Sequence, residues 1–390
     1  MSTKVKKFLA HFSIPIVIIF LLFGPASGLD SFNLAAAFAS IRPDGHTASF
    51  FVAPPLLPSP QPVWQRLNYP NLPSGRFNAS LTYNPVNQVA LLFGGFNSTS
   101  GLLNELWLTN GRDWMQFYTP HSPPERSGAN LVYDEAHQGA VLFGGANDST
   151  LFGDTWFFNG IDWIQKNPPI SPSPRVGASM AYDAERKIGI LFGGLFYTTG
   201  TNDVTLGDMW VWDGENWQQQ FPAVLPPARW GASMVYDAAH LNILLFGGAA
   251  DGGLRDDTWI WDGSSWIEQH PMHHPAGRAD YSMAYDESRQ QVILFGGQTS
   301  PNLTPAETWA WDGEDWLLLP TKRAPPEELT YGTQLVYLPE FQTVMLFGDY
   351  RWKTDDPEAE VQFGEYSDVW ALNYQYFIYL PTVYNPVDLP

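Results

Sequence analysis

The sequence predicts an all-β protein folded as a six-bladed β-propeller with four antiparallel strands in each blade. The first observation is a marker of the form Leu-Phe-Gly-Gly, or close to it, that recurs at intervals of 50, 49, 54, 49 and 52 residues. The second is a tyrosine eleven residues before the first glycine of every marker. The third is the composition of 17 Trp, 34 Gly and 33 Pro in 390 residues, which is typical of turn-rich β repeats. A repeat of about 50 residues fits one propeller blade. The marker glycines are Gly94, Gly144, Gly193, Gly247, Gly296 and Gly348.

Each repeat divides into four strands, which we call a, b, c and d. Strand a runs from a recurrent arginine to the tyrosine, b ends at the marker, and c and d each carry one tryptophan. The b segments, such as 187–192 and 292–295, are nearly continuous apolar runs, as expected of strands covered on both faces by neighbouring blades. The a–b and c–d turns then lie on one rim of the ring, and the b–c and d–a connections on the other.

The two tryptophans of a repeat stand seven residues apart and enclose an Asn-Gly or Asp-Gly pair, which is typical of a two-residue type I′ hairpin turn. A turn of that length at Asp213-Gly214 places Trp210 directly opposite Trp217. We therefore expect cross-strand aromatic pairs, each worth about 0.5–1.5 kcal/mol beyond the area that it buries.

The ends of the repeat region predict how the ring closes. The last repeat has Trp370 on strand c, but no second tryptophan follows at seven residues. Trp64 stands alone, twelve residues before Arg76, and four other repeats show the same spacing between the second tryptophan and the next arginine. We expect Trp64 to lie on the missing strand d, opposite Trp370, so that the ring has no free sheet edge.

The regions outside the repeats suggest an exported protein. Lysines 4, 6 and 7 precede an apolar run over residues 12–23, and small residues follow at 26–28, so residues 1–28 are predicted to be a cleaved signal peptide. The alternative is an uncleaved anchor, although the run is short for a membrane span. Residues 29–62 are predicted to be a Pro-rich spacer with little regular structure, residues 63–374 the propeller, and residues 375–390 a tail. After signal cleavage we expect no membrane span, a monomer, and a location outside the cell or on its surface.

The charge balance and the absence of cysteine exclude several classes of function. The 40 acidic residues against 20 Lys and Arg, a formal net charge of −20, argue against nucleic acid as a partner, because its phosphates need a cationic face. With no Cys, disulfide scaffolds and thiol catalysis are excluded.

The repeat resembles the kelch repeat, and residues 64 to about 373 are similar to kelch β-propellers of the galactose oxidase central-domain superfamily. The resemblance rests on the regularly spaced arginine, tyrosine, glycine pair and tryptophan pair. It implies a ring of six or seven blades, of which the repeat count favours six. It implies no single chemistry, because propellers include both enzymes and binding modules. Galactose oxidase itself needs a tyrosine linked to a cysteine, and that cofactor cannot form in this chain.

The recurrent arginine has two interpretations. It forms an ion pair inside the fold, for instance with the acid two residues before the first tryptophan, or it contacts a ligand. The resemblance allows the second interpretation, because arginines around the channel mouth of some kelch domains bind acidic peptides. The arginines concerned are Arg76, Arg126, Arg175, Arg229 and Arg278.

The b–c connections vary most in length, which makes them candidates for binding on a constant scaffold. The longest are residues 195–207, with Tyr197, and residues 349–367, with Arg351 and Trp352. The alternative interpretation of both segments is a solvated loop with one aromatic side chain packed beneath.

The start of strand a should line the central channel, where most repeats carry Gly followed by Ala. Asp280 and Tyr281 break that rule of small residues. Trp230 and Tyr331, together with Phe77, stand just before this position and could form an aromatic rim suited to a sugar or a side chain. Simple filling of the channel is the alternative.

The sequence holds no strong catalytic or metal-binding motif, so we expect no metal and no cofactor. His270, His273 and His274 share one d–a loop without a clear carboxylate partner. The favoured hypothesis is an exported module that binds a protein or glycan without catalysis. The alternative is a secreted carbohydrate-active enzyme with acids such as Asp280 at the channel mouth. A third, weaker hypothesis is a purely structural or adhesive surface module.

Overall fold

The computed structural model describes residues 60–197, 203–300, 303–326, 332–348 and 367–375, together with three short strands nearer the N-terminus. The chain divides into two compact units, Met1–Gln61 with Gln375–Pro390, and Pro62–Tyr374. The described part of the first unit is an antiparallel sheet of β1 (Val17–Leu21), β2 (Ala36–Ser40) and β3 (Ser49–Val52). Strands β2 and β3 fall in the segment expected to have little regular structure. The prolines of that segment cluster after β3, and the strands themselves consist of Ala, Ser, Phe and Val.

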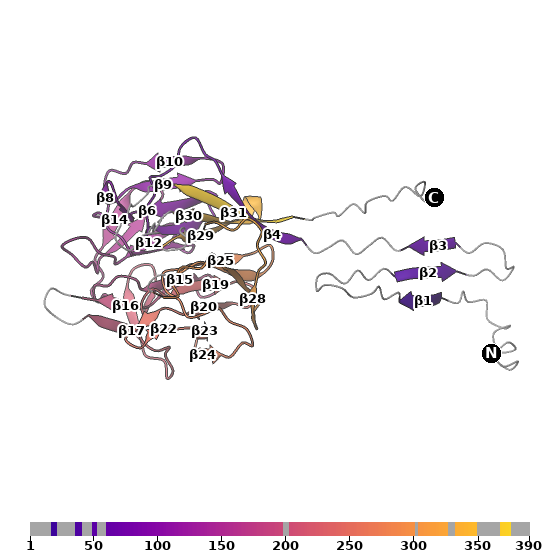
Figure 1. The fold of residues 1–390 in the computed structure, drawn as a ribbon. Helices are drawn as coiled ribbons and strands as arrows, with labels where there is room; N and C mark the ends of the chain where they lie inside the picture. Colours follow the sequence, from indigo (N-terminus) through magenta and orange to yellow (C-terminus); the bar gives the residue numbers. More distant parts are fainter. Residues whose placement is uncertain are drawn as a thin grey trace, which may run out of the picture. The chain divides into compact units, whose positions relative to one another are not determined.

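The second unit is a six-bladed β-propeller, and each blade is a four-stranded antiparallel sheet (Figure 1). The prediction of the fold class is therefore confirmed. Blade one contains β5 (Ser80–Asn84), β6 (Val89–Phe93), β9 (Leu106–Thr109) and β10 (Trp114–Phe117); blade two contains β11 (Asn130–Asp134), β12 (Gly139–Phe143), β13 (Thr155–Phe158) and β14 (Trp163–Lys166). Blade three contains β15 (Ser179–Asp183), β16 (Ile188–Phe196), β17 (Val204–Trp212) and β18 (Trp217–Gln220); blade four contains β19 (Ser233–Asp237), β20 (Asn242–Phe246), β23 (Thr258–Trp261) and β24 (Trp266–Gln269). Blade five contains β25 (Ser282–Asp286), β26 (Gln291–Phe295), β27 (Thr308–Trp311) and β28 (Trp316–Leu318).

Blade six joins the two ends of the propeller. It consists of β29 (Gln334–Leu338), β30 (Thr343–Gly348), β31 (Asp368–Gln375) and, as its outermost strand, β4 (Gln61–Leu67). A short 3-10 helix, η3 (Pro339–Phe341), lies in its a–b turn, and two small hairpins lie in the b–c connections of other blades, β7 (Phe96–Asn97) with β8 (Gly101–Leu102) and β21 (Ala249–Ala250) with β22 (Gly253–Leu254). The predicted closure of the ring by an N-terminal strand is confirmed. Which residue lies directly opposite Trp64 stays a prediction.

The closing tryptophan repeats a contact that joins every pair of neighbouring blades. Trp64 is completely buried, and its ring lies 5.1 Å from the ring of Phe295 on strand b of blade five. The second tryptophan of each other blade packs in the same way on the last phenylalanine of strand b in the preceding blade, at 5.1 to 5.9 Å. These pairs are Trp114–Phe347, Trp163–Phe93, Trp217–Phe143, Trp266–Phe192 and Trp316–Phe246. The aromatic contacts therefore run around the whole ring.

The expected pairing of the two tryptophans of one repeat is wrong by two residues. Trp217 lies opposite Trp212, and Trp210 lies opposite Gln219. The reason is a turn of four residues instead of two, because the carboxylate of Asp213 accepts the backbone N–H groups of residues 215 and 216 at 2.9 and 2.7 Å. Only Gly214 has a positive φ, of 102°, whereas a type I′ turn needs positive φ at both central residues. A shift of two residues keeps both tryptophans on the same face of the blade.

The expected long loop over residues 195–207 is largely an extension of the blade-three hairpin. Leu195 pairs with Thr205 and Phe196 with Val204, beyond an irregularity at Phe192/Gly194. The side chains on both arms are apolar or β-branched, which suits strand pairing more than a solvated loop. The b strands themselves are confirmed as fully covered, since Ile190 and Leu191 have no exposed surface and Phe192 has 1%.

Candidate functional site

The five recurrent arginines lie inside the propeller, at the joints between its strands. The guanidinium of Arg229, which is 1% exposed, donates to both carboxylate oxygens of Asp257 at 2.7 Å and to the carbonyl of Gly247 at 2.8 Å. The other four are 0 or 1% exposed and bind the corresponding acid at 2.6 to 2.9 Å, so the ion-pair interpretation is confirmed. These pairs are Arg76–Glu105, Arg126–Asp154, Arg175–Asp208 and Arg278–Glu307.

Each of these acids also accepts a hydrogen bond from the first tryptophan of its repeat. In blade four the indole Nε1 of Trp259 donates to Asp257 at 2.8 Å, and the same bond recurs in the other four complete repeats at 2.6 to 3.0 Å. Blade six lacks the arginine, and its acid, Asp368, instead forms an ion pair with Arg66 of β4. The closing strand therefore supplies the cation that this blade's own repeat does not.

The glycine pair explains how neighbouring blades approach one another. The N–H of Gly194 donates to the carbonyl oxygen of Arg229 in the next blade at 2.8 Å. A Cβ atom on Gly193 would lie only 2.4 Å from the same oxygen. The recurrent arginine, acid, tryptophan and glycine thus form one structural joint, which is shared by the five blades that have the arginine and is completed in blade six by Arg66.

The channel entrance on the b–c and d–a side is framed by a closed ring of six backbone hydrogen bonds. In each blade the residue two positions after the recurrent arginine, or after position 330 in blade six, donates its N–H to the carbonyl of its counterpart in the preceding blade, at 2.8 to 3.2 Å. All six residues have positive φ, between 50° and 65°. They are Asn78, Gly128, Gly177, Gly231, Asp280 and Gly332.

This ring corrects the reason why Asp280 stands where most repeats have glycine. The sequence suggested a shortage of space, but the shared requirement is a left-handed backbone conformation, which Gly adopts freely and Asn and Asp tolerate better than other residues. At Gly177 the nearest atom to an added Cβ would be 3.5 Å away, which is an ordinary contact. Asn78 and Asp280 therefore fit the ring without a change in the backbone, and each adds a polar side chain that the other four blades lack.

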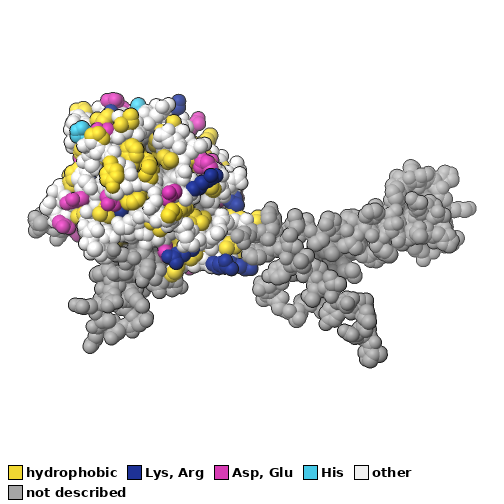
Figure 2. Space-filling view, turned by 90° about the horizontal axis from the view of Figure 1, so that it is seen from above, with side chains coloured by type: hydrophobic (Ala, Val, Ile, Leu, Met, Phe, Trp, Pro, Cys, Tyr) yellow, Lys and Arg dark blue, Asp and Glu magenta, His cyan; other side chains and the backbone are white. Residues whose placement is uncertain are grey.

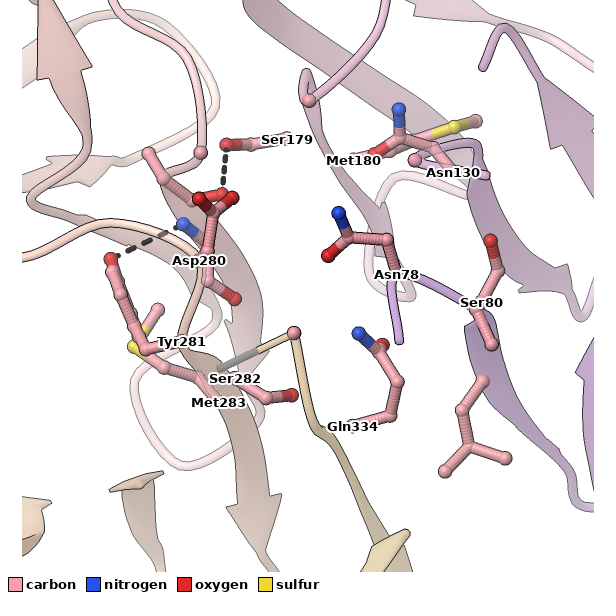
Figure 3. Close-up of a pocket in the computed structure, with 18 of the residues that line it drawn as sticks. Asn78, Ser80, Asn130, Ser179, Met180, Asp280, Tyr281, Ser282, Met283 and Gln334 are labelled. Atoms are coloured by element: carbon pink, nitrogen blue, oxygen red, sulfur yellow. Dashed lines mark hydrogen bonds between the residues drawn. The ribbon is translucent and has the colours of Figure 1, made fainter. Parts of the chain in front are cut away.

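Inside this ring lies a cavity of about 180 Å³, lined in all six blades by four consecutive residues, of which the ring residue is the first (Figure 3). One position in every blade is polar: Ser80, Asn130, Ser179, Ser233, Ser282 and Gln334. Among the described residues that line the cavity, Asp280 is the only charged one. In Figure 3, the amides of Asn78 and Gln334 and the carboxylate of Asp280 project into the same space.

Two polar atoms in the lining have no hydrogen-bond partner in the described part of the chain. They are Nδ2 of Asn130 and Oγ1 of Thr333, and Thr333 is 1% exposed. Because buried polar groups are nearly always paired with protein, ordered water or a ligand, we expect these two atoms to bind ordered water or a polar group of a ligand.

Tyr281 belongs to the wall of the channel and not to its open entrance. It is 6% exposed, its hydroxyl donates to the carbonyl of Phe246 in blade four, and it accepts the N–H of Ser233 at 3.2 Å. Burial raises the pKa of Tyr281, so the hydroxyl stays protonated at neutral pH. Its role in the structure is to fill the joint between blades four and five.

The aromatic rim expected above the ring is described in part. Trp230 and Phe77 are half-buried, directly before ring residues of blades four and one, and the ring of Phe77 lies 5.3 Å from that of Phe96. Tyr331 lies outside the described residues, as do Arg351 and Trp352. Tyr197 is 36% exposed and directly follows β16, in the extended hairpin of blade three.

The sequence analysis did not identify the acidic residues at the opposite mouth of the channel, where the a–b turns lie. The tyrosines of strand a end there, and the hydroxyl of Tyr83 donates to Glu340 at 2.5 Å. Burial and the charges of Glu135, Asp286 and Glu340 raise the pKa of Glu287. In the sequence, a glutamate directly follows the Tyr-Asp pair of blades two and five. That these a–b turns lie close together becomes visible only in the folded structure.

The surface that surrounds these features is mostly polar, with isolated apolar side chains. On the face shown in Figure 2, hydrophobic side chains form small separate groups among acidic and uncharged ones. Examples of exposed apolar residues are Tyr118 at 80%, Phe221 at 81% and Met272 at 84%. His273 pairs with Asp315 at 2.8 Å, and no group of three potential metal ligands occurs among the described residues. Within those same residues, no helix has the length and hydrophobicity needed to cross a membrane.

A scan against protein-family models found no match for this chain, and a search of curated proteins found none either.

Proposed function

We propose that this protein is an exported kelch-type β-propeller that binds a protein or glycan through the face formed by its b–c and d–a connections, without catalysing a reaction. The observation that carries the proposal is the entrance of the central channel. Around it, the half-buried Trp230 and Phe77 stand directly before ring residues, and Asp280 and Asn78 give two blades polar side chains that the others lack.

The distribution of symmetric and asymmetric residues supports a binding site at this entrance. A ligand site usually breaks the symmetry of a repeat, whereas residues found in every blade serve the scaffold. The recurrent arginines are engaged within the fold, so they offer no free guanidinium to an acidic peptide. The blade-specific side chains, which are half-buried, lie instead at the entrance of the central channel. The proposal of export rests on the basic and apolar character of residues 1–28.

A secreted carbohydrate-active enzyme is the alternative, and the channel supports it less well. Glycoside hydrolysis generally needs two carboxyl groups about 5–10 Å apart. Among the described residues, the lining of the cavity contributes one carboxyl group, that of Asp280. Among the described residues, binding therefore has more support than catalysis.

Glycan and peptide arrays probed with the full chain test this proposal. We expect saturable binding to some members that Trp230→Ala and Phe77→Ala both weaken by tenfold or more. Ile161→Ala is the matched control, because it removes an exposed apolar side chain from the c–d turn of blade two, on the opposite rim of the propeller. Binding that survives both entrance variants, or turnover of a bound glycan that Asp280→Asn abolishes, would contradict the proposal.

A further inference from the structure

The sequence contains two Asn-Gly pairs, Asn110-Gly111 and Asn159-Gly160, which lie in the c–d turns of blades one and two. Their surroundings differ, and the difference points to a modification site. We propose that Asn159 deamidates in the folded protein and becomes aspartate or isoaspartate, whereas Asn110 is protected. The reaction needs only water as a co-reactant, and it does not depend on what the central channel binds.

The reaction joins the side chain of an asparagine to the backbone of the glycine that follows it. The backbone nitrogen of Gly160 loses its proton to the solvent and attacks Cγ of Asn159, so that a C–N bond forms. The bond between Cγ and Nδ2 breaks, and Nδ2 takes up a proton and leaves as ammonia. Water then opens the resulting succinimide ring, which leaves one of its two carbonyls as an amide and the other as a carboxylate. Glycine permits the attack readily, because it has no Cβ beside its nitrogen.

Hydrogen bonds prepare the attacked carbon in both turns. Oδ1 of Asn159 accepts the N–H groups of Ile161 and Asp162, each at 2.9 Å. Oδ1 of Asn110 accepts the corresponding two N–H groups of its own turn at 3.0 and 3.3 Å. Negative charge develops on this oxygen when the nitrogen attacks Cγ, so two donors aimed at it stabilise the transition state as an oxyanion hole does. Both side chains are exposed to water, so these features are shared by the two sites.

The attacking nitrogen distinguishes the two turns. The N–H of Gly111 donates to Oγ1 of Thr109 at 3.0 Å. The residue at the equivalent position in blade two is Phe158, which offers no acceptor, and within the described residues the N–H of Gly160 donates to no other group. Because a hydrogen bond from the protonated amide opposes the loss of its proton, Gly160 gives up its proton more readily than Gly111.

The two turns also differ in their freedom to rearrange, which matters because closing the succinimide ring rotates the backbone of the asparagine. A Cβ placed on Gly111 would lie 2.5 Å from the ring of Phe341, in η3 of blade six. The hydroxyl of Tyr69 donates to the carbonyl of Gly111 at 2.9 Å. A Cβ placed on Gly160 would meet no atom within 4 Å. The turn of blade one is therefore held by its neighbours, whereas the turn of blade two has open space around its glycine.

The aspartate product fits the structure. Blades three, four and five carry aspartate at the equivalent position, and its carboxylate accepts the same two backbone N–H groups at 2.7 to 3.0 Å. These residues are Asp213, Asp262 and Asp312. Deamidation to aspartate therefore gives blade two the turn that three other blades have by sequence, with one added negative charge.

Peptide mapping by mass spectrometry tests the proposal on the full chain, incubated in its folded state at neutral pH. Replacing the amide by a carboxyl group changes the mass of a peptide, so both asparagines are followed in the same sample. We expect Asn159 to react faster than Asn110 by about tenfold or more, since the free energy of one hydrogen bond changes a rate by up to about that factor. In concentrated urea the two sites should react at similar rates, because glycine follows both. Equal rates in the folded protein, or an Asn159 that reacts only in urea, would overturn the proposal.

Thr109→Val is the matched variant, because it removes the acceptor of the Gly111 N–H and keeps the shape of the side chain. It should speed the deamidation of Asn110 several-fold and leave the rate at Asn159 unchanged. An Asn110 that stays as slow as before would contradict the role of that hydrogen bond. Asn159→Asp should abolish the mass change at blade two and unfold at the same urea concentration as the unaltered chain. A clear loss of stability in this variant would contradict the fit of the product.

Discussion

The indole Nε1 of Trp64 donates a hydrogen bond to Oγ1 of Thr308, 2.9 Å away, and so ties the first strand of the propeller to strand c of blade five. Trp217 with Thr155 and Trp316 with Thr258 repeat the bond at 2.8 and 3.1 Å. The strand that closes the ring is thus held by the same contact as strands inside complete blades.

Replacing Thr308 by Val should weaken this closure. The substitution keeps the shape of the side chain but leaves the buried indole N–H of Trp64 without an acceptor, which costs about 1–3 kcal/mol. We expect the free energy of unfolding in urea to fall by that amount. Thr308→Ser retains the hydroxyl and should recover much of the loss. A Val variant as stable as the unaltered protein would show that the bond contributes nothing to closure.

The opposite change should stabilise blade one. Nε1 of Trp114 is buried with no partner in the described part of the chain. Val369 precedes Trp370 as Thr308 precedes Trp309, and it packs in the same core cluster as Trp114. Val369→Thr should therefore offer an acceptor and raise the free energy of unfolding by about 0.5–1.5 kcal/mol. Val344→Thr, at another fully buried position, is the control and should be destabilising. A loss of stability in Val369→Thr would contradict the assignment.

The buried ion pairs predict how stability depends on pH. Burial alone would raise the pKa of Asp208, but hydrogen bonds from Arg175 and its charge outweigh burial and hold the pKa below its ordinary value of 3.8. A group whose pKa is lower in the folded state adds stability above its unfolded pKa and loses it as the pH falls. The pKa values of Glu105, Asp257 and Glu307 are lowered in the same way.

We therefore expect the free energy of unfolding to be nearly constant above about pH 5 and to fall steeply toward pH 3. Asp208→Asn should cost about 3–5 kcal/mol at pH 7, because it leaves the buried guanidinium without its counter-charge, and it should flatten the acid limb. Urea unfolding from pH 3 to pH 7 measures both. An identical acid limb in the variant would contradict the lowered pKa of Asp208.

The hydrogen-bonded ring of the channel makes a prediction about backbone conformation alone. Gly177→Ala has room for its methyl group but must hold a φ of about 62°, which costs about 1–2 kcal/mol. Gly177→Asn should cost less, because Asn occupies the equivalent place at position 78. Thermal unfolding of the two variants compares them directly. If Ala were tolerated better than Asn, space and not φ would control these positions.

Much of the fold could be predicted because the spacing of the repeated residues corresponds to the order of the strands in each blade. Trp64, twelve residues before Arg76, indicated the closing strand, and the acid before each first tryptophan indicated the partner of the arginine. The turn at Asp213 could not be assigned in this way, since Asp-Gly suits both a two-residue turn and the four-residue turn that its carboxylate stabilises.

The candidate site was harder to predict because it depends on contacts between blades. The sequence showed that Asp280 stands where most repeats have glycine. The reason, a left-handed backbone conformation shared by all six positions, becomes visible only in the ring of hydrogen bonds that joins them. Tyr281 was an exception of the same kind in the sequence, yet its hydroxyl is used inside the wall. A sequence does not tell which of two adjacent side chains points into a channel.

The central claim is that recurrent residues build the ring and blade-specific residues at the channel entrance bind the ligand. Arg229 and Trp230 are neighbours in the chain, and replacing each of them tests this claim most directly. For each variant of the full chain, both the ligand affinity and the free energy of unfolding are measured. Trp230→Ala should lower affinity for the array ligand tenfold or more and change stability by less than about 1 kcal/mol. Arg229→Met should lower stability by about 3–5 kcal/mol and leave the affinity of the folded protein unchanged. The reverse pattern, with affinity lost at Arg229 and stability lost at Trp230, would contradict the account.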